Sequence, residues 1–482
     1  MTSREAELLV RVEELEKQLA QALFINDRLE KENAALKKKV SELEEKLRTS
    51  SSNSSMPPSS DLPDKKKKKH RKKGKRKRGG QPGHEGKTRT LVPQEEVDEI
   101  VDCPPEEQCE CGGAVQVDRA NPERHQLFEL PEVKPTIWEF LIYGGVCERC
   151  GKAHRGKLPE GVPPGMLGPR AMAAVAVLSG KYHLSKRGME ELLSDLFGME
   201  LSLGTISNTE ARVSEALETP VEEAKAYVQG EGVVHADETG HKVAGKRAWM
   251  WVAVTAWVSV FLIRFSRGQQ VAKELLGEAF GGFVVSDRWN GYNWLSAAQR
   301  QLCFAHLTRD FTKIAERSGK SKEIGDKLLA YVQKLFHLWH LFKEGRLSRS
   351  AFQLKMAPIR REVESLLEEA TVCGNAKTER MCKRILKLKD ALWTFVDVPG
   401  VEPTNNMAER TIRPYVLWRK SSFGAQSERG NLFVERMMTV SATCRQQNRN
   451  VLDYVTDAVR AHLCGNEAPS LLPFNFAFSE AI

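Results

Sequence analysis

Leucine and a few other apolar residues recur with a seven-residue period in the first part of the chain. One heptad position holds Leu8, Leu15, Ala22, Leu29, Leu36 and Leu43, and the other holds Val12, Leu19, Asn26, Asn33, Val40 and Leu47. This period predicts a coiled-coil helix over residues 5–48. Asn at the second position favours a parallel two-stranded coil, because buried Asn pairs penalise other registers. We therefore expect a homodimer or higher oligomer, with a lone surface helix as the alternative.

The spacing of apolar residues over residues 165–230 predicts helices, and glycines mark the breaks between them. Within this segment, "LLSDLFGMELSLGTISN" predicts a helix, a glycine turn and a second helix capped by Ser202. This arrangement resembles a DNA-binding helix-turn-helix, and plain helical packing explains it equally well.

From residue 231 the pattern changes to short apolar runs that predict strands. The first three are "GVVHADET", "AWMWVAVT" and "SVFLIRFS". A helix, "QQVAKELLGEAF", precedes a fourth strand, "GGFVVSD", and a fifth, "RQLCFAH", precedes a helix from Thr308. This order is that of the α/β ribonuclease H-like fold, which we expect over residues 231–446. A C-terminal helix and tail are expected over residues 447–482.

A helical insertion interrupts this domain at about residues 318–395. Its apolar residues recur at helical intervals, as in Leu328, Val332, Leu335, Trp339 and Phe342. The insertion has no role that the residues suggest.

Charge is concentrated in one segment. The net charge of the 482-residue chain is +9, and the fourteen residues 65–78 hold twelve cations, so the remainder carries 9 − 12 = −3. The twelve are Lys65, Lys66, Lys67, Lys68, Lys69, Arg71, Lys72, Lys73, Lys75, Arg76, Lys77 and Arg78. With the Ser-rich stretch before it, this run predicts a disordered basic linker over residues 49–95. Such an arm would release counterions on meeting DNA, whereas the alternative is a solvated tail.

Five of the ten cysteines lie between residues 103 and 150. Two pairs, in "CECGG" and "CERCG", flank the strand-like "TIWEFLIYGG", and each is followed by Gly. The four are Cys109, Cys111, Cys147 and Cys150. Thiolates from two tight turns suit tetrahedral zinc, so we expect a structural zinc ribbon-like module over residues 96–160. The one-residue gap in the first pair leaves Cys103 or His125 as an alternative ligand, and ordinary thiols are the other interpretation.

No stretch predicts a membrane span. The longest apolar run, residues 248–263, has sixteen residues and is interrupted by Thr255 and Ser259. With no charged-then-apolar leader, the sequence predicts a cytoplasmic protein.

Two acids stand at the ends of predicted neighbouring strands. Asp237 lies on the first strand and Asp287 ends the fourth, so their carboxylates converge in this fold, although either could simply cap a turn. Strand alternation sends Glu238 to the opposite face from Asp237. A site for two magnesium or manganese ions needs a third carboxylate. Glu409, in the first turn of a helix capped by Asn405 or Asn406, is the candidate.

Spacing alone does not select the third acid, since Glu428 and Glu435 are rivals. Around Glu409 stand Arg410, Arg413, Arg419 and Lys420. We expect the acid to hold metal while these cations hold the flanking phosphates of DNA. The alternative is a helix-surface pair between Glu409 and Arg413, which contributes only a few tenths of a kcal/mol.

Several motifs together resemble the insertion-sequence 66 family of bacterial DDE transposases. They are "HADET", "SDRWNGY", "CFAHLTRDF" and "NNMAERTIRP", and the zipper, the basic run with "GGQPGHEG" and the cysteine module stand before them in the family's order. The resemblance implies that Asp237, Asp287 and Glu409 are the catalytic triad. It also implies that Cys303, His306, Arg309 and Asp310 form a signature near the site, although the residues alone predict that Cys303 and His306 are core. The gap in "CECGG" departs from the family pattern.

The resemblance implies a DNA transposase. Such an enzyme binds the terminal inverted repeats of its element, nicks the DNA and joins the freed 3′-hydroxyl to target DNA, both by in-line phosphoryl displacement. Pairing two ends would explain the zipper, and element-encoded accessory proteins and a location at the bacterial nucleoid are further expectations. The alternatives are a non-catalytic DNA-binding protein, such as a transposase remnant or repressor, and a ribonuclease H-like nuclease that cuts without joining.

Overall fold

The computed structural model describes residues 3–48, 90–120 and 122–473. Its contacts divide the chain into two units, residues 63–136 and the remainder. The predicted basic run at residues 65–78 lies outside the described residues. No helix in the described ranges combines the length and the apolar character that crossing a membrane would require.

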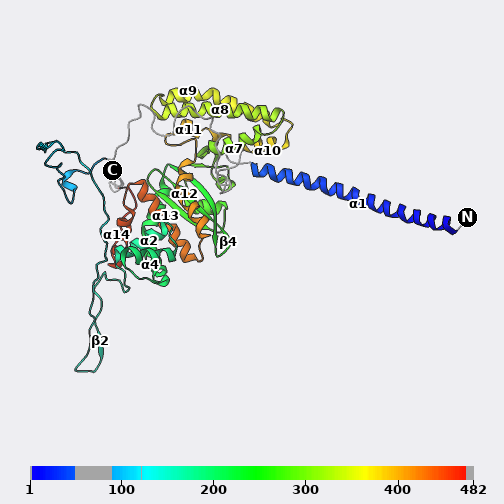
Figure 1. The fold of residues 1–482 in the computed structure, drawn as a ribbon. Coiled ribbons are helices and arrows are strands. Elements are labelled where there is room, and N and C mark those ends of the chain that lie inside the picture. The colour runs from blue at the N-terminus through cyan, green and yellow to red at the C-terminus, as the bar shows by residue number, and fades with distance from the viewer. Residues whose placement is uncertain (1–2, 49–89, 121, 474–482) are drawn as a thin grey trace. The chain divides into compact units, whose positions relative to one another are not determined.

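Helix α1, Ser3–Arg48, is one uninterrupted helix (Figure 1). The predicted helix is therefore confirmed. Several apolar residues of the heptad positions are exposed on it, and these are Leu15, Leu29, Leu36 and Val40. An exposed apolar stripe is what a coiled-coil seam requires, but pairing of two such helices stays a prediction.

The unit of residues 63–136 contains little regular structure among its described residues. It holds the short 3-10 helix η2, Gln94–Glu96, and one antiparallel bridge between Gln108 and Ala114. In the other unit, strands β1, Gly144–Val146, and β2, Ala153–Arg155, form a hairpin. The predicted strand in "TIWEFLIYGG" is wrong over most of its length, since strand structure begins only at Gly144.

A five-stranded mixed sheet forms the centre of the larger unit. Its strands are β3, Val233–Val243, β4, Lys246–Val254, β5, Ser259–Arg264, β6, Phe283–Ser286, and β7, Arg300–Leu302. They lie in the order β5-β4-β3-β6-β7, with β3, β4 and β5 antiparallel and β6 and β7 parallel to β3. The five predicted strands are confirmed, and the fold is mixed α/β.

The fifth strand is shorter than predicted. β7 ends at Leu302, Cys303 precedes the next helix, and α7 spans Phe304–Ala315. The expected helix start at Thr308 is therefore wrong by one turn, and His306 lies on a helix.

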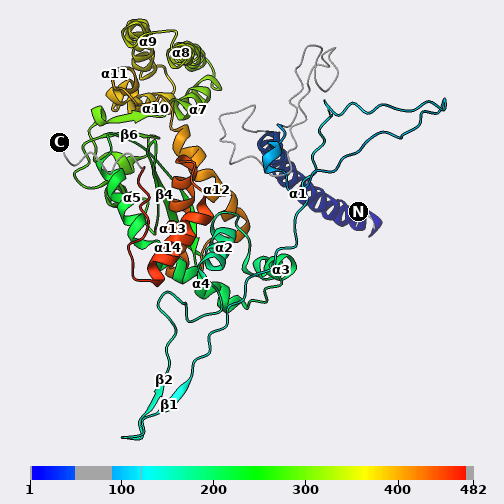
Figure 2. The same ribbon diagram turned by 90° about the vertical axis from the view of Figure 1, so that its left-hand side faces the viewer.

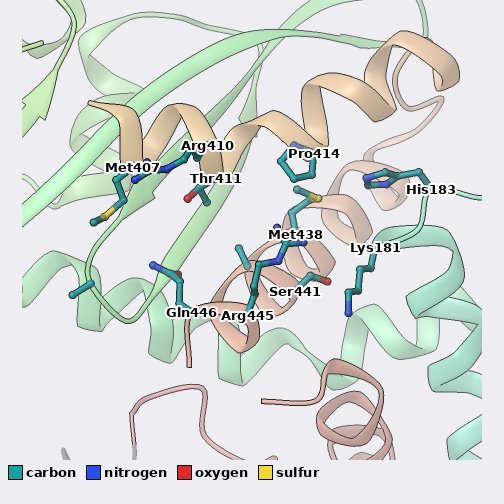
Figure 3. A pocket seen from close by; sticks show the side chains of 12 residues that line it. Lys181, His183, Met407, Arg410, Thr411, Pro414, Met438, Ser441, Arg445 and Gln446 are labelled. Atoms are coloured by element: carbon teal, nitrogen blue, oxygen red, sulfur yellow. The ribbon is translucent and has the colours of Figure 1, made fainter. Parts of the chain in front are cut away.

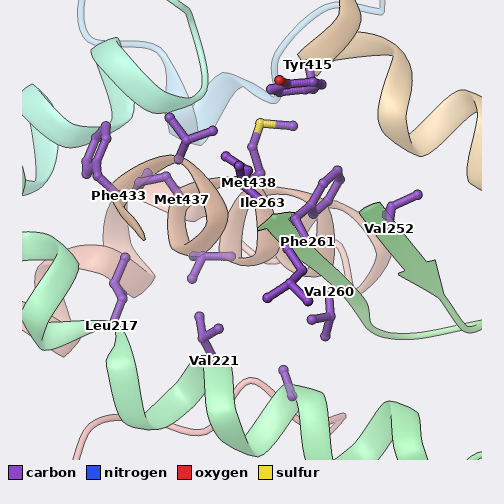
Figure 4. Close-up of a cluster of buried hydrophobic side chains, with 14 of the residues drawn as sticks. Leu217, Val221, Val252, Val260, Phe261, Ile263, Tyr415, Phe433, Met437 and Met438 are labelled. Carbon is purple, nitrogen blue, oxygen red and sulfur yellow. The ribbon is translucent and has the colours of Figure 1, made fainter. Parts of the chain in front are cut away.

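Helices cover the sheet and protect one of its edges. The helices are α6, Gln269–Leu276, α12, Asn406–Ser422, α13, Glu428–Gln446, and α14, Val451–Leu463. α12 packs on β3 and β4, while α13 packs on β5 (Figure 2). Apolar residues of β5 and α13, including Phe261, Met437 and Met438, bury one another there (Figure 4).

Side chains of α13 accept hydrogen bonds from the backbone N–H groups at the free edge of β5. Backbone N–H groups of Ser259, Phe261 and Ile263 donate to the side chains of Thr443, Thr439 and Glu435 at 3.1, 3.0 and 2.7 Å. The acceptors stand four residues apart on one helix face, which matches alternate residues of the strand. An open strand edge is thereby closed without another strand.

Four helices precede the sheet, as predicted for residues 165–230. They are α2, Pro169–Gly180, α3, Lys186–Phe197, α4, Leu203–Ala216, and α5, Glu218–Gly230. Gly198 ends α3 with φ 62°, where a side chain would be strained, and the Ser202 hydroxyl accepts from Thr205 N at 3.1 Å. The predicted helix, glycine turn and capped helix are confirmed, whereas DNA binding by them stays a prediction.

The helical insertion has a hydrophobic core of its own. It comprises α8, Lys320–Lys343, α9, Arg349–Ala370, α10, Ala376–Leu386, η5, Lys389–Leu392, and α11, Thr394–Asp397. Its buried residues form a cluster with Leu302 of β7 and Phe304 of α7. The predicted insertion is confirmed, and its core continues into the elements that carry Cys303 and His306.

Candidate active site

The register of two parallel strands places Asp237 beside Asp287. His235 of β3 pairs with Val285 of β6, so two residues further along the same register Asp237 stands opposite Asp287. Neighbouring residues in register on parallel strands point to the same side of a sheet. The two carboxylates therefore share one side at the end of β6.

Glu409 reaches this side from the first turn of α12. Asn405, just before that helix, donates from Nδ2 to the Ala236 carbonyl at 2.8 Å, and its Oδ1 lies 3.3 Å from Nδ1 of His235. Its backbone N–H donates to Cys303 Sγ at 3.1 Å. Asn405 holds the predicted N-cap position, but its side chain binds β3 instead of capping the helix. This anchor fixes the start of α12 next to the strand that carries Asp237.

The three acids influence one another electrostatically. Burial first, and then the charges of Glu238, Asp287 and Glu409, raise the pKa of Asp237 well above its usual value. No Lys or Arg of the described chain forms an ion pair with Asp237, Asp287 or Glu409. Carboxylates that crowd together without a cation are costly. A bound divalent cation would relieve this repulsion.

Glu238 is bound to other residues on the opposite face. Arg267 Nη2 lies 2.6 Å from its Oε1, and the Tyr292 hydroxyl donates to its Oε2 at 2.9 Å. The guanidinium of Arg267 also stacks over the Trp289 ring, 3.8 Å from its centroid. The carboxylate of Glu238 thus has an arginine and a tyrosine as partners. The choice of Asp237 as the site acid, which rested on alternation only in part and on the family resemblance, stays a prediction.

The rival third acids differ from Glu409. Glu435 accepts from Ile263 N at the edge of β5 and pairs with Arg264 at 3.1 Å, and burial raises its pKa to about 7. Glu428 is exposed in the first turn of α13. The helix-surface pair between Glu409 and Arg413 does not form in the structure.

His306 faces Glu409, which the residues alone did not predict. Nδ1 of His306 lies 3.4 Å from Oε1 of Glu409, and both atoms are buried and lack a hydrogen-bond partner among the described residues. Burial and the charge of Arg309 lower the pKa of His306, against the opposing charges of Asp287 and Glu409. The sequence feature that could have shown this is the three-residue spacing between Cys303 and His306. On a helix this spacing is about one turn, so both side chains lie on the same side at the start of α7.

Cys303 is buried, as the residues predicted. Its pKa is raised to about 11 by burial, and its Sγ, His306 and Glu409 offer donor atoms within 4.8 Å of one another. The thiol is protonated at neutral pH. Its observed contact is with the backbone before α12, so it fixes that helix to α7.

Comparison with known proteins shows the family of the chain. The model of the family described as "Transposase IS66 family" matches residues 164–432. The chain belongs to the IS66 transposase family. A second model, described as "Family of unknown function (DUF6444)", matches residues 1–90.

Two similar proteins come from Sinorhizobium fredii (strain NBRC 101917 / NGR234). "Uncharacterized protein y4qI" is 25% identical over 425 residues, which cover 79% of this chain and 76% of the relative. "Uncharacterized protein y4hP" is 23% identical over 389 residues, covering 73% and 70%. The likeness to IS66 transposases that the motifs indicated is confirmed.

This IS66-family chain has a cationic cavity on a face of α12 that does not include Glu409. The cavity of about 290 Å³ is lined by Met407, Arg410, Thr411 and Pro414 of α12, by Lys181 and His183 after α2, and by Ser441 and Arg445 of α13 (Figure 3). Lys181, Arg410 and Arg445 have no acidic partner in the described chain, and the Ser441 hydroxyl is buried without a hydrogen bond there. These groups suit an anion such as a DNA phosphate.

The predicted phosphate-binding cations of this IS66-family chain have different surroundings. Arg410, Arg413 and Lys420 are exposed. Arg419 is partly buried and donates to the Thr239 hydroxyl at 2.9 Å and to the Gly240 carbonyl. Arg419 therefore joins α12 to β3, and contact of any of the four with DNA stays a prediction.

The two cysteine pairs stand in tight turns, one in each unit. Gly112 N donates to the Cys109 carbonyl at 2.7 Å, and Gly151 N donates to the Cys147 carbonyl at 2.8 Å. The backbone N–H of Gly113 lowers the pKa of Cys111, and that of Cys150 lowers the pKa of Cys147. Turns that favour thiolates fit zinc. The zinc site, including the alternative ligand Cys103, stays a prediction.

Proposed function

We propose that this transposase-family protein is a DNA strand-cleaving and strand-joining enzyme of the DDE type, with Asp237, Asp287 and Glu409 as its metal ligands. One observation carries the proposal, which is the lack of a Lys or Arg ion pair at any of the three among the described residues. The proposal is also supported by the neighbouring parallel strands that carry or precede Asp237 and Asp287, and by the charges of Asp287 and Glu409 that act on Asp237. The neighbouring acids Glu238 and Glu435 both have arginine partners. The strand order supports a ribonuclease H-like fold for this domain.

The donor set fits magnesium or manganese. Carboxylate oxygens are the ligands that these hard cations take, and the unpartnered Oε1 of Glu409 is available. When bound, two such ions activate the attacking oxygen and stabilise the leaving one in an in-line displacement. The protein's part is to fix the positions of the three carboxylates, and the contacts of Asn405 do so for Glu409.

The surroundings of the site support DNA as the substrate. Arg410 follows Glu409 directly, and together with Lys181 and Arg445 it lines the cationic cavity. These cations support binding of DNA phosphates on a face of α12 other than that of Glu409. The basic run at residues 65–78 would add affinity without sequence preference.

The remaining parts fit an enzyme that brings two element ends together. The exposed heptad residues of α1 support pairing of two copies. The cysteine turns, with structural zinc, and helices α3 and α4 are the parts that we assign to recognition of the terminal inverted repeats. Accessory proteins encoded by the element belong to the same hypothesis.

The test compares wild type with Glu409→Gln and with Glu428→Gln, an exposed acid on the next helix. Purified full chain is incubated with labelled element-end DNA, a target plasmid and Mg²⁺ or Mn²⁺. We expect wild type and Glu428→Gln to cut and join, and Glu409→Gln to bind DNA while losing at least about 10³-fold in rate, the effect of several kcal/mol.

Other outcomes would select another function. Cleavage without any joined product would indicate a nuclease. Equal DNA binding by all three proteins with no cleavage, even when the element's other proteins are supplied, would favour a non-catalytic DNA-binding protein.

A further inference from the structure

We propose that His306 is a protein ligand of the ion that Glu409 holds, so that the centre is a mixed nitrogen and oxygen site selective for manganese over magnesium. This inference rests on the proposed function, since it assumes that Glu409 holds an ion. It adds a fourth protein ligand and a preferred metal.

The first argument is the distance between two unsatisfied atoms. Nδ1 of His306 and Oε1 of Glu409 lie 3.4 Å apart, and neither has a hydrogen bond within the described chain. Buried polar atoms are nearly always hydrogen-bonded, so two facing atoms that both lack a hydrogen bond need an explanation. Two ligands of one ion at about 2.1 Å each can be no more than roughly 4.2 Å apart. One ion can therefore satisfy both atoms.

The second argument is a contrast with other histidines of the same domain. His235 has Asn405 as a partner at 3.3 Å, and His241 has Asn431 at 3.0 Å as well as the Tyr415 hydroxyl. Both are more deeply buried than His306. The protein satisfies these two rings with its own side chains, but it leaves Nδ1 of His306 directed at a metal-binding carboxylate.

The third argument concerns which atoms of the cluster take part. Cys303 Sγ is close to the other two donor atoms, but it already accepts the backbone N–H of Asn405 at 3.1 Å. That contact helps to fix the start of α12, together with the two side-chain contacts of Asn405 to β3. Cys303 is therefore a positioning residue, and His306 and Glu409 are the pair that faces the ion.

The ligand chemistry predicts the metal. Magnesium and manganese both take carboxylate oxygens, but manganese, as a first-row transition ion, accepts an imidazole nitrogen more readily than magnesium does. A carboxylate pair and an imidazole would thus bind Mn²⁺ more tightly than Mg²⁺, and removal of the imidazole would reduce this difference. Zinc would also accept the nitrogen, although its usual four-coordinate site is smaller than the two-ion centre.

The experiment detects the nitrogen directly by pulsed electron paramagnetic resonance of Mn²⁺ bound to the full chain. A coordinated imidazole gives ¹⁴N modulation of the electron spin echo. The proteins are wild type, His306→Asn, Cys303→Ser, and His337→Ala as a matched control at an exposed histidine of α8. Asn keeps an oxygen donor near the same place, and circular dichroism checks that each variant is folded.

We expect ¹⁴N modulation in wild type, Cys303→Ser and His337→Ala, and none in His306→Asn. The ratio of Mn²⁺ to Mg²⁺ affinity should fall about tenfold in His306→Asn alone. Bound Mn²⁺ that depends on Glu409 but shows no ¹⁴N modulation would overturn the role of His306 and leave the proposed function standing. Mn²⁺ binding that is unchanged in both Asp237→Asn and Glu409→Gln would overturn the proposed function itself.

Discussion

Two groups of acids around the central sheet have opposite surroundings. Glu238 and Glu435 are buried, and each accepts an arginine and a further donor, Tyr292 for Glu238 and Ile263 N for Glu435. Asp237, Asp287 and Glu409 form no ion pair with a Lys or Arg of the described chain, and burial first, then the charges of Glu238, Asp287 and Glu409, raise the pKa of Asp237. A fold can neutralise a buried carboxylate when stability is what matters. Where it does not, an external cation can neutralise the carboxylates, and this is the basis of the proposed metal site.

The largest effect should follow from removing a paired acid. Glu238→Ala leaves Arg267 and the Tyr292 hydroxyl without their partner, so we expect a loss of about 3 kcal/mol in the free energy of unfolding. Asp237→Ala, one residue away, removes no ion pair and should cost far less. Urea unfolding of both variants measures the difference. Equal losses would remove the distinction between the two groups of acids.

Divalent ions should stabilise the protein through the unpaired acids. At a free concentration a hundred times Kd, an ion that binds only the folded state adds about 2.7 kcal/mol. We expect this gain from Mn²⁺ in wild type and in Glu428→Gln, and we expect none in Glu409→Gln. Thermal unfolding with and without the ion provides the measurement. A similar gain in all three proteins would place the bound ion elsewhere.

The unpaired acids should cost stability when no ion is present, and the cost should depend on pH. Because the folded-state pKa of Asp237 is raised, its contribution is complete below the unfolded value of about 4 and is lost as pH rises toward the folded value. Asp237→Asn stays neutral, so it should match wild type near pH 4. At pH 7 it should be more stable by about 1–2 kcal/mol. Unfolding measured across this pH range, without divalent ions, tests the sign.

Cations, like the acids, divide into those with a partner of opposite charge and those without one. Removing an unpaired cation should have the smallest of the effects predicted here. Arg410 has no acidic partner, whereas Arg360 pairs with Glu364 at 3.0 Å in the insertion. Arg410→Ala should weaken DNA binding similarly for all sequences and reduce the slope of log affinity against log salt by about one. Arg360→Ala should change neither quantity. Fluorescence anisotropy over a range of salt concentrations measures both, and an unchanged slope for Arg410→Ala would remove Arg410 from the DNA contact.

Some parts of the fold followed from local pattern alone. The heptads predicted α1, alternation and short apolar runs predicted the five strands, and helical spacing predicted the insertion, because each signal lies within one element. Alternation along a strand separated Asp237 from Glu238, but the choice of Asp237 also needed the family resemblance. The apolar stretch before Gly144 shows the limit of prediction from local pattern. A run of strand-forming residues forms no strand unless another strand pairs with it.

Other features depend on contacts between distant segments and needed the tertiary structure. The acceptors that α13 offers to β5 come from residues more than 170 positions away in sequence, so no local pattern showed that Glu435 has a structural role. Asn405 looked like a helix cap, but β3 supplied a better partner for its side chain. His306 looked like a core residue until α7 and α12 brought its Nδ1 to Glu409.

The sequence by itself determined which elements form, and together with the family resemblance it selected the three candidate acids. Short-range sterics and periodic burial act within a few residues, which is why these features can be read from the chain. Only the tertiary structure decided which acids receive a protein cation and which do not. That difference depends on distances between side chains of separate elements, and Coulomb energies change steeply over those distances.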